Sequence, residues 1–371
     1  MNYWYPVFFS VILLACDSGT PNEILNTPRS DGGVSPPNTD SGIAMDVGIA
    51  MDASSSKDAG TSPPVPDAGT LPSPSVKLEE TYQVTRSTHV YAQGLSYDQW
   101  GSDTTTTVDL PLDLYLPESA PPNRPAMVII HGGGFSGGSR DTAQFIEFGE
   151  FFASRGWVCI SIDYRLARDR GTIPEVWGQY VEENVPQNKR NQARALYPAA
   201  RDTKAAIRWL YAQAETYKIN TDYITAMGGS AGAALAIMTG VTDAQDYRDE
   251  LTTELDETLA STHLDQSADI AAILDYWGSG VLVNTLNAVH GHQRYDVNDA
   301  PINIVHGTED PTVLFSEAEA LRDAYLSTGV DYAFHPLEGA RHGPWGATIA
   351  GKNLRENGFD FITSQLELTV E

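Results

Sequence analysis

The feature that most constrains this chain is the pentapeptide Gly228-Gly-Ser-Ala-Gly232, which lies between an apolar segment and an Ala-rich segment. It fits the pattern G-x-S-x-G, in which a serine stands on a sharp strand-to-helix turn with its hydroxyl exposed. Glycines are expected on both sides of Ser230 because the backbone of such a turn is strained and larger side chains would collide with neighbouring elements. Gly and Ser also form ordinary turns, so the pentapeptide needs supporting residues elsewhere in the chain.

Strand and helix patterns alternate along the chain and predict an α/β fold. Short apolar or alternating runs predict strands at residues 108–116, 126–130, 157–163, 222–227, 268–276, 301–305 and 330–335. Helical patterns lie at residues 145–152, from Pro198 onward, and at 230–241, 314–328 and 345–369. Such alternation predicts a mostly parallel sheet with helices on both faces and ligands bound beyond the carboxyl ends of the strands. Ser230 follows one of those ends.

Two prolines and one polar segment give local expectations. Pro111 interrupts the first strand pattern and predicts that this strand lies at an edge of the sheet. Pro198 predicts the first turn of a helix, where its missing N–H has no cost. Residues 164–197 are polar and show no regular period, so we expect an irregular insertion over the sheet that serves as a small cap.

A serine nucleophile needs a base and an orienting carboxylate. His342 is the candidate base because it lies in a Gly-rich loop after the last predicted strand. Asp310 is the favoured acid because it directly follows the strand 301–305, with Asp275, at the end of another strand, as its rival. The chain order Ser230, Asp310, His342 is that of α/β-hydrolases. His306 begins a turn and is interpreted as structural.

The glycine run after the buried strand 126–130 is the candidate oxyanion hole, which stabilises the negative charge of an acyl-transfer intermediate. Consecutive glycines let the backbone approach a substrate carbonyl closely. The amides of Gly133 and Gly134, together with that of Ala231 after the serine, are the expected donors. A phosphate-binding loop is excluded because no Lys-Ser/Thr pair follows.

Six segments together resemble a known family, the α/β-hydrolase carboxylesterases of the hormone-sensitive-lipase and bacterial feruloyl-esterase-like groups. They are His131-Gly-Gly-Gly-Phe135, Ser161-Ile-Asp-Tyr-Arg-Leu166, Asp202-Thr-Lys-Ala-Ala-Ile-Arg-Trp-Leu210, Gly228-Gly-Ser-Ala-Gly232, His306-Gly-Thr-Glu-Asp310 and Gly339-Ala-Arg-His342. The resemblance spans about residues 80–370 and implies an α/β-hydrolase fold with a partly mobile cap. It also implies a Ser/His/Asp esterase in which His131 orients the glycine loop and Asp163 is a structural acid. No cofactor or metal is implied.

The N-terminal segment predicts export and anchoring. Residues 1–15 read as a signal peptide, with an apolar core from Val7 to Ala15 that is too short to span a bilayer. Leu13-Leu14-Ala15-Cys16 resembles the lipobox of bacterial lipoproteins, which implies a lipid anchor on Cys16. Residues 16–76 are rich in Pro, Gly, Ser and Asp and predict a disordered tether, followed by a catalytic domain at 77–371. We expect a lipid-anchored protein of the bacterial cell envelope, outside the cytoplasm.

The formal net charge of −26 excludes a nucleic-acid partner, because no basic patch is present to neutralise phosphate. The expected partner is a small-molecule ester, cleaved through an acyl-enzyme intermediate. Two alternatives remain open: a serine peptidase of the prolyl-oligopeptidase type, and a non-catalytic surface binding module on an esterase scaffold. Four tryptophans are candidates either for a substrate pocket or for the core: Trp157, Trp177, Trp277 and Trp345.

Overall fold

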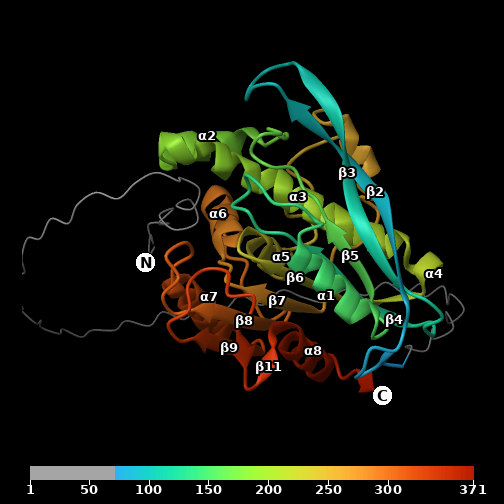
Figure 1. Cartoon of the computed structure of the whole chain (residues 1–371). Coiled ribbons are helices and arrows are strands. Elements are labelled where there is room, and N and C mark those ends of the chain that lie inside the picture. Colours follow the sequence, from blue (N-terminus) through green and yellow to red (C-terminus); the bar gives the residue numbers. More distant parts are fainter. Residues whose placement is uncertain (1–71) are drawn as a thin grey trace, which may run out of the picture. The chain divides into compact units, whose positions relative to one another are not determined.

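The computed structural model describes residues 72–371 (Figure 1). The predicted signal segment 1–15, Cys16 and nearly all of the predicted tether lie outside the described residues. Strand β1 (Ser75–Val76) pairs in parallel with the C-terminal strand β12 (Thr369–Val370), so the two ends of the described part lie together. Among residues 72–371, no helix is both long and apolar enough to cross a membrane.

The centre of the molecule is an eight-stranded sheet in the order β2-β3-β5-β4-β6-β7-β8-β9. Strands β2 and β3 pair antiparallel, as do β3 and β5, and all other neighbours are parallel. The strands are β2 (Val84–Tyr97), β3 (Thr105–Pro117), β4 (Arg124–Ile130), β5 (Val158–Ile162), β6 (Ile219–Gly229), β7 (Ala272–Tyr276), β8 (Ile302–Gly307) and β9 (Tyr332–Leu337). This arrangement confirms the predicted, mostly parallel sheet.

Helices cover both faces of this sheet (Figure 1). They are α1 (Ala143–Ala153), α2 (Glu175–Asn184), α3 (Arg190–Ala212), α4 (Ala214–Tyr217), α5 (Ala231–Val241), α6 (Val281–His290), α7 (Phe315–Thr328) and α8 (Leu354–Gln365). Alternate residues of β4 enter two separate cores: Met127 and Ile129 pack with α1 and α8, whereas Val128 and Ile130 pack with α3 and α5. Period-two alternation in a strand buried on both faces produces this division.

The expectation that Pro111 marks an edge strand is wrong. Its strand, β3, lies inside the sheet between β2 and β5. The missing N–H is tolerated because Pro111 faces an irregularity of β2 between Val90 and Ala92, and its pairing with β5 begins only at Leu112. The carbonyl of Pro111 still accepts the N–H of Asp163. A proline at a bulge in the neighbouring strand therefore fits an interior position.

The segment 164–197 is helical over much of its length, which corrects the predicted irregular insertion. Helix α2 lies within it, and α3 begins at Arg190, so Pro198 stands inside a helix and not in its first turn. The amphipathic period of α3 is hidden in the sequence because several of its charged residues are buried along with its alanines. They are Arg201, Asp202, Lys204 and Arg208.

Two further boundaries differ from the sequence pattern. Helix α6 lies between the predicted strands 268–276 and 301–305, where the sequence pattern indicates no helix. The predicted closing helix 345–369 is shorter, because α8 begins only at Leu354. A short hairpin of β10 (Thr348–Ile349) and β11 (Lys352–Asn353) precedes it, and Asn353 caps the helix in a capping box with Glu356.

A buried ion pair joins two of the motifs that the sequence singled out. The guanidinium of Arg165 donates to both carboxylate oxygens of Asp202 on α3, and the backbone N–H of Arg165 donates to the same carboxylate. Both side chains are almost fully buried. The pair holds the segment after β5 against α3.

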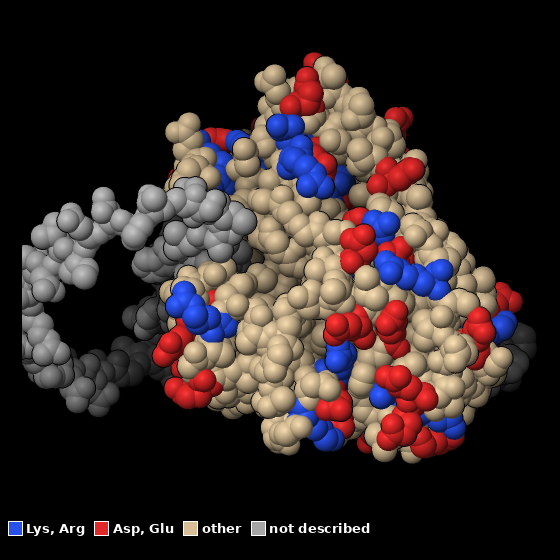
Figure 2. Space-filling view, in the orientation of Figure 1, with Lys and Arg blue, Asp and Glu red and all other residues tan. Residues whose placement is uncertain are grey.

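On the face shown in Figure 2, charged side chains of both signs lie in small mixed groups.

Candidate active site

Ser230 stands at the turn between β6 and α5 in a backbone conformation that side chains rarely adopt, with φ 57° and ψ −119°. Such a conformation costs on the order of 1–3 kcal/mol and persists only where the surroundings enforce it. Here the N–H of Ser230 donates to the carbonyl of Tyr276 on the neighbouring strand, and its carbonyl accepts the N–H of Ala234 in α5. The turn is therefore fixed on both the strand side and the helix side.

The glycines on both sides of Ser230 are required by space. A Cβ on Gly228 would lie 2.2 Å from the backbone carbon of Gly232, and a Cβ on Gly232 would lie 2.1 Å from the carbonyl oxygen of Ile130. Both contacts are with backbone atoms, which cannot move aside as the end of a flexible side chain can. The sharp turn thus depends on α5 packing directly against β4 and β6.

The structure brings Ser230, His342 and Asp310 into one hydrogen-bonded row. Nε2 of His342 lies 3.0 Å from Oγ of Ser230, and its Nδ1 lies 2.6 Å from Oδ2 of Asp310. The loops that carry the acid and the base are tied together, because the N–H of Glu309 donates to the carbonyl of Ala340. This bond holds the loops of Asp310 and His342, which are far apart in the sequence, in a fixed position relative to each other.

The protonation pattern of this row follows from Asp310. Burial by itself raises the pKa of Asp310, but hydrogen bonds from His306, His342 and the backbone outweigh it and hold the pKa well below its usual range. An ionised carboxylate can only accept, so Nδ1 of His342 carries the proton and Nε2 has a free lone pair. Nε2 is then able to accept the proton of the Ser230 hydroxyl.

The rival acid, Asp275, lies one strand away at the end of β7 and is fully buried. Its Oδ1 accepts the N–H of Gly278 at 2.7 Å. Burial raises the pKa of Asp275 to about 6, whereas the charge of His306 opposes this shift. The carboxylate within hydrogen-bond distance of His342 is that of Asp310, so the geometry favours Asp310 for the acid.

The glycine loop that follows β4 is held by its carbonyl groups. The carbonyl of Gly133 accepts two backbone N–H groups, that of Gly134 accepts the amide of Gln192 from α3, and that of Phe135 accepts the N–H of Ala167. Within residues 72–371 the N–H groups of Gly133 and Gly134 have no hydrogen-bond acceptor. They are free to donate to a bound group, as is the N–H at the start of α5.

His131 and Asp163 secure the base of the same loop. Nδ1 of His131 lies 2.7 Å from the carbonyl oxygen of Gly132, and its ring stacks on Tyr164 with centroids 4.3 Å apart. Burial lowers the pKa of His131, which keeps the ring uncharged at neutral pH. Asp163 accepts the backbone N–H of Arg140 and pairs with its guanidinium. These contacts agree with the anchoring roles that the family resemblance implies.

Two of the four tryptophans lie at the site. The Trp345 indole would lie 2.7 Å from a Cβ on Gly229, next to the nucleophile, and it packs edge-on against Trp277 with centroids 4.6 Å apart. Trp277 in turn lies edge-on to His342. Trp277 is also fully buried, in the same core as Trp157, whereas Trp177 belongs to the other core and Trp345 is only partly buried.

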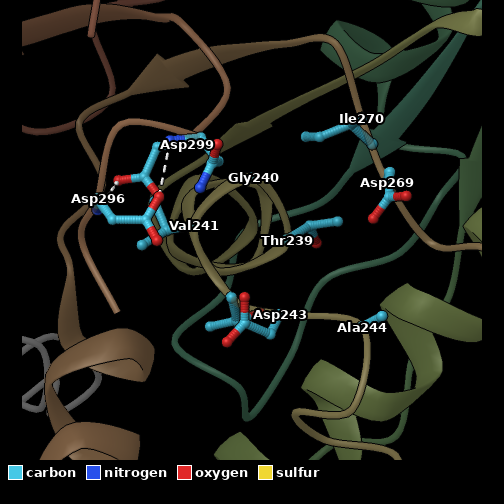
Figure 3. Close-up of a pocket in the computed structure, with 11 residues that line it drawn as sticks. Thr239, Gly240, Val241, Asp243, Ala244, Asp269, Ile270, Asp296 and Asp299 are labelled. Atoms are coloured by element: carbon cyan, nitrogen blue, oxygen red, sulfur yellow. Dashed lines mark hydrogen bonds between the residues drawn. The ribbon is translucent and has the colours of Figure 1, made fainter. Parts of the chain in front are cut away.

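A separate polar cavity of about 280 Å³ lies at the opposite end of α5 (Figure 3). Its lining includes Asp243, Asp269, Asp296 and Asp299, near the residues that precede β7 and β8. Because α5 spans 11 residues, this cavity lies roughly 16 Å from the turn at Ser230. In the described part of the chain, no group of three or more His, Cys, Asp or Glu side chains is placed to hold a metal ion.

Comparisons with known proteins relate this chain and its fold to a family. The BD-FAE family model matches residues 112–176 and 180–297, which include the glycine loop and Ser230 but neither Asp310 nor His342. The chain is 27% identical over 259 residues to esterase LipC of Mycobacterium tuberculosis, covering 62% of this chain and 58% of that relative. The chain therefore spans less than two thirds of the length of that relative.

Solved structures give the same result. The chain is 26% identical to Thermogutta terrifontis esterase 2 phosphoramylated by tabun, with a TM-score of 0.53, covering 75% of this chain and 94% of that one. It is 25% identical to the propionate-bound form, with a TM-score of 0.52, covering 76% and 94%. Together with the sheet order, these matches show that the chain belongs to the α/β-hydrolase carboxylesterases. The predicted family is thereby confirmed.

The packing of the turn gives a direct test of what holds Ser230. We expect Gly232→Ala to lower the melting temperature and to abolish ester hydrolysis, because its Cβ would collide with the backbone of β4. Gly178→Ala in α2 is the matched control, since a Cβ there would meet only Ile173 at 3.6 Å, and alanine favours a helix interior by about 1 kcal/mol. Thermal unfolding and turnover of both variants check this. A G232A protein as stable and active as the wild type would contradict the packing argument.

Proposed function

We propose that this protein hydrolyses carboxylic esters, with Ser230 as the nucleophile, His342 as the general base and Asp310 as the orienting acid. The observation that carries the proposal is the continuous row of hydrogen bonds from Oγ of Ser230 through His342 to Asp310. The esterases among its relatives support the reaction type.

In the first half of the reaction, Nε2 of His342 takes the proton from Ser230 as Oγ attacks the ester carbonyl carbon. The carbonyl oxygen becomes negatively charged, and the N–H groups of Gly133, Gly134 and Ala231 donate hydrogen bonds to it. Each such donor contributes about 10²–10³ in rate in other enzymes. Collapse of the tetrahedral intermediate breaks the bond to the alcohol oxygen, which receives the proton from His342.

In the second half, water replaces the alcohol. His342 accepts a proton from the water, the resulting hydroxide attacks the acyl carbon, and Ser230 leaves with the proton returned by His342. The products are a carboxylic acid and free enzyme. Throughout, Asp310 keeps the proton of the neutral imidazole on Nδ1 and stabilises the imidazolium that forms in each half.

Variants of Ser230, Asp310 and Asp275 test the assigned catalytic roles, with hydrolysis of p-nitrophenyl acetate as the assay. We expect Ser230→Ala to remove turnover and leave the melting temperature within a few degrees of the wild type. Asp310→Asn leaves the geometry in place but favours the wrong tautomer of His342, and a loss of roughly 10⁴ in kcat follows from that change in a serine protease. The loss of kcat in Asp275→Asn should be at least about 100-fold smaller than the loss in Asp310→Asn.

Persistence of turnover in S230A, or a greater loss in D275N than in D310N, would refute this assignment. Dipeptidyl amides assayed in parallel distinguish an esterase from the peptidase alternative. Failure of every ester and amide to turn over would favour the non-catalytic alternative.

We further propose that the acyl group is short. The partly buried Trp345 lies next to Ser230, with the fully buried Trp277 packed edge-on against it, and one related esterase was solved with propionate bound. We expect kcat/KM to be highest for acetyl to butyryl esters and to fall for octanoyl esters. Trp345→Ala should raise kcat/KM for the octanoyl ester relative to the acetyl ester by at least about tenfold. An unchanged ratio in W345A would contradict a role for this indole in acyl selection.

A further inference from the structure

A second histidine, His306, lies next to Asp310 in addition to His342. His306 is the penultimate residue of β8 and is fully buried. Its Nε2 lies 2.8 Å from the carbonyl oxygen of Val313 and 3.4 Å from Oδ2 of Asp310. The same Oδ2 accepts Nδ1–H of His342 from the other side. Asp310 thus lies between two imidazoles, and the mechanism proposed above uses only one of them.

The contacts of His306 define its donor. A backbone carbonyl only accepts, so Nε2, which faces Val313, carries a proton and is also directed toward Asp310. Nδ1 has no hydrogen-bond partner among residues 72–371. The ring of Phe315, edge-on at 6.1 Å between centroids, packs nearby. His306 is therefore a buried hydrogen-bond donor whose Nε2–H faces Asp310 and the carbonyl of Val313 in the turn after β8.

Three carboxylates surround this imidazole on the elements packed against β8. They are Asp310 in the turn after β8, Asp275 at the end of β7 and Glu317 in the first turn of α7. Burial lowers the pKa of His306, but its hydrogen bonds to Asp310 and Val313 and the charge of Asp275 outweigh this and raise it. A positive charge on His306 would favour the ionised forms of these carboxylates, which disfavour one another's ionisation.

The same contacts also fix the direction of the Asp310 carboxylate. Its Oδ1 accepts the N–H groups of Thr312 and Val313, at 2.8 Å and 3.0 Å. His306 binds the carbonyl of Val313, so it holds the turn that supplies these donors. Loss of its Nε2–H would release the turn and leave Oδ2 with His342 alone.

We propose that His306 is a positioning residue of this active site, which holds the Asp310 carboxylate ionised and directed at His342 through its Nε2–H and through the turn after β8. The inference rests on the proposed Ser230 mechanism. It assigns a function to a residue that the sequence pattern marked as structural.

A pair of polar variants isolates the Nε2 donor. The amide of His306→Gln extends to about the position of Nε2, whereas that of His306→Asn ends near the position of Nδ1. We expect H306N to lower kcat by at least about 10-fold, with KM within about twofold, because orientation of the base acts on the chemical step. H306Q should recover kcat to within about threefold of the wild type. His335→Gln, a half-buried histidine on the adjacent strand β9, is the control and should leave kcat unchanged.

The pathway through Asp310 is tested by a double variant. If His306 acts through Asp310, H306N combined with Asp310→Asn should be little slower than D310N alone, because the two changes remove one function. Equal kcat in H306N and H306Q, or losses that multiply in full in the double variant, would overturn the inference. S230A separates the two proposals. Turnover in S230A refutes the function itself, whereas an inactive S230A with wild-type kcat in H306N refutes only the role of His306.

Discussion

The backbone of Ser230 is the constraint on which the rest of this site depends. With φ at 57°, the serine is held at the end of β6 by backbone hydrogen bonds and because α5 begins at once and packs against β4 and β6, with no side chain on Gly228 or Gly232. This close packing fixes where α5 starts, and with it the first N–H groups of the helix. The same strand, β4, leads into the glycine loop, so the nucleophile and the candidate oxyanion donors are set by one contact between neighbouring elements.

Electrostatics then determines what the serine can do. The Asp310 carboxylate is buried, yet donors on both of its oxygens keep its pKa low, and it can therefore orient His342 as a neutral base. Asp275 shows the opposite outcome one strand away, because it has one backbone donor and burial raises its pKa. Two aspartates at the ends of neighbouring strands thus differ in role because their hydrogen-bond donors differ.

The sequence predicted the parts of this architecture that depend on local pattern. The alternating strands and helices and the glycine-flanked turn at Ser230 follow from short-range spacing. Ser230, Asp310 and His342 became candidates because each follows a strand that the local pattern predicts. The expectations from Pro111 and Pro198 were wrong because tertiary contacts outweighed the local preference of proline. For Pro111 the cause is the bulge in β2, and for Pro198 it is the packing of α3. The contact of His306 with Asp310 was missed, because the sequence pattern placed His306 at the start of a turn and does not show which side chains lie beside it.

The most direct test of the central claim is covalent labelling of the nucleophile by paraoxon, a reagent that phosphorylates a related esterase. Mass spectrometry of the digested protein would locate the diethyl phosphoryl group while the loss of ester hydrolysis is followed in the same sample. We expect one group per chain, on the peptide that contains Ser230, with labelling and inactivation in proportion. Full inactivation with the label on another residue, or full activity with Ser230 labelled, would contradict the account.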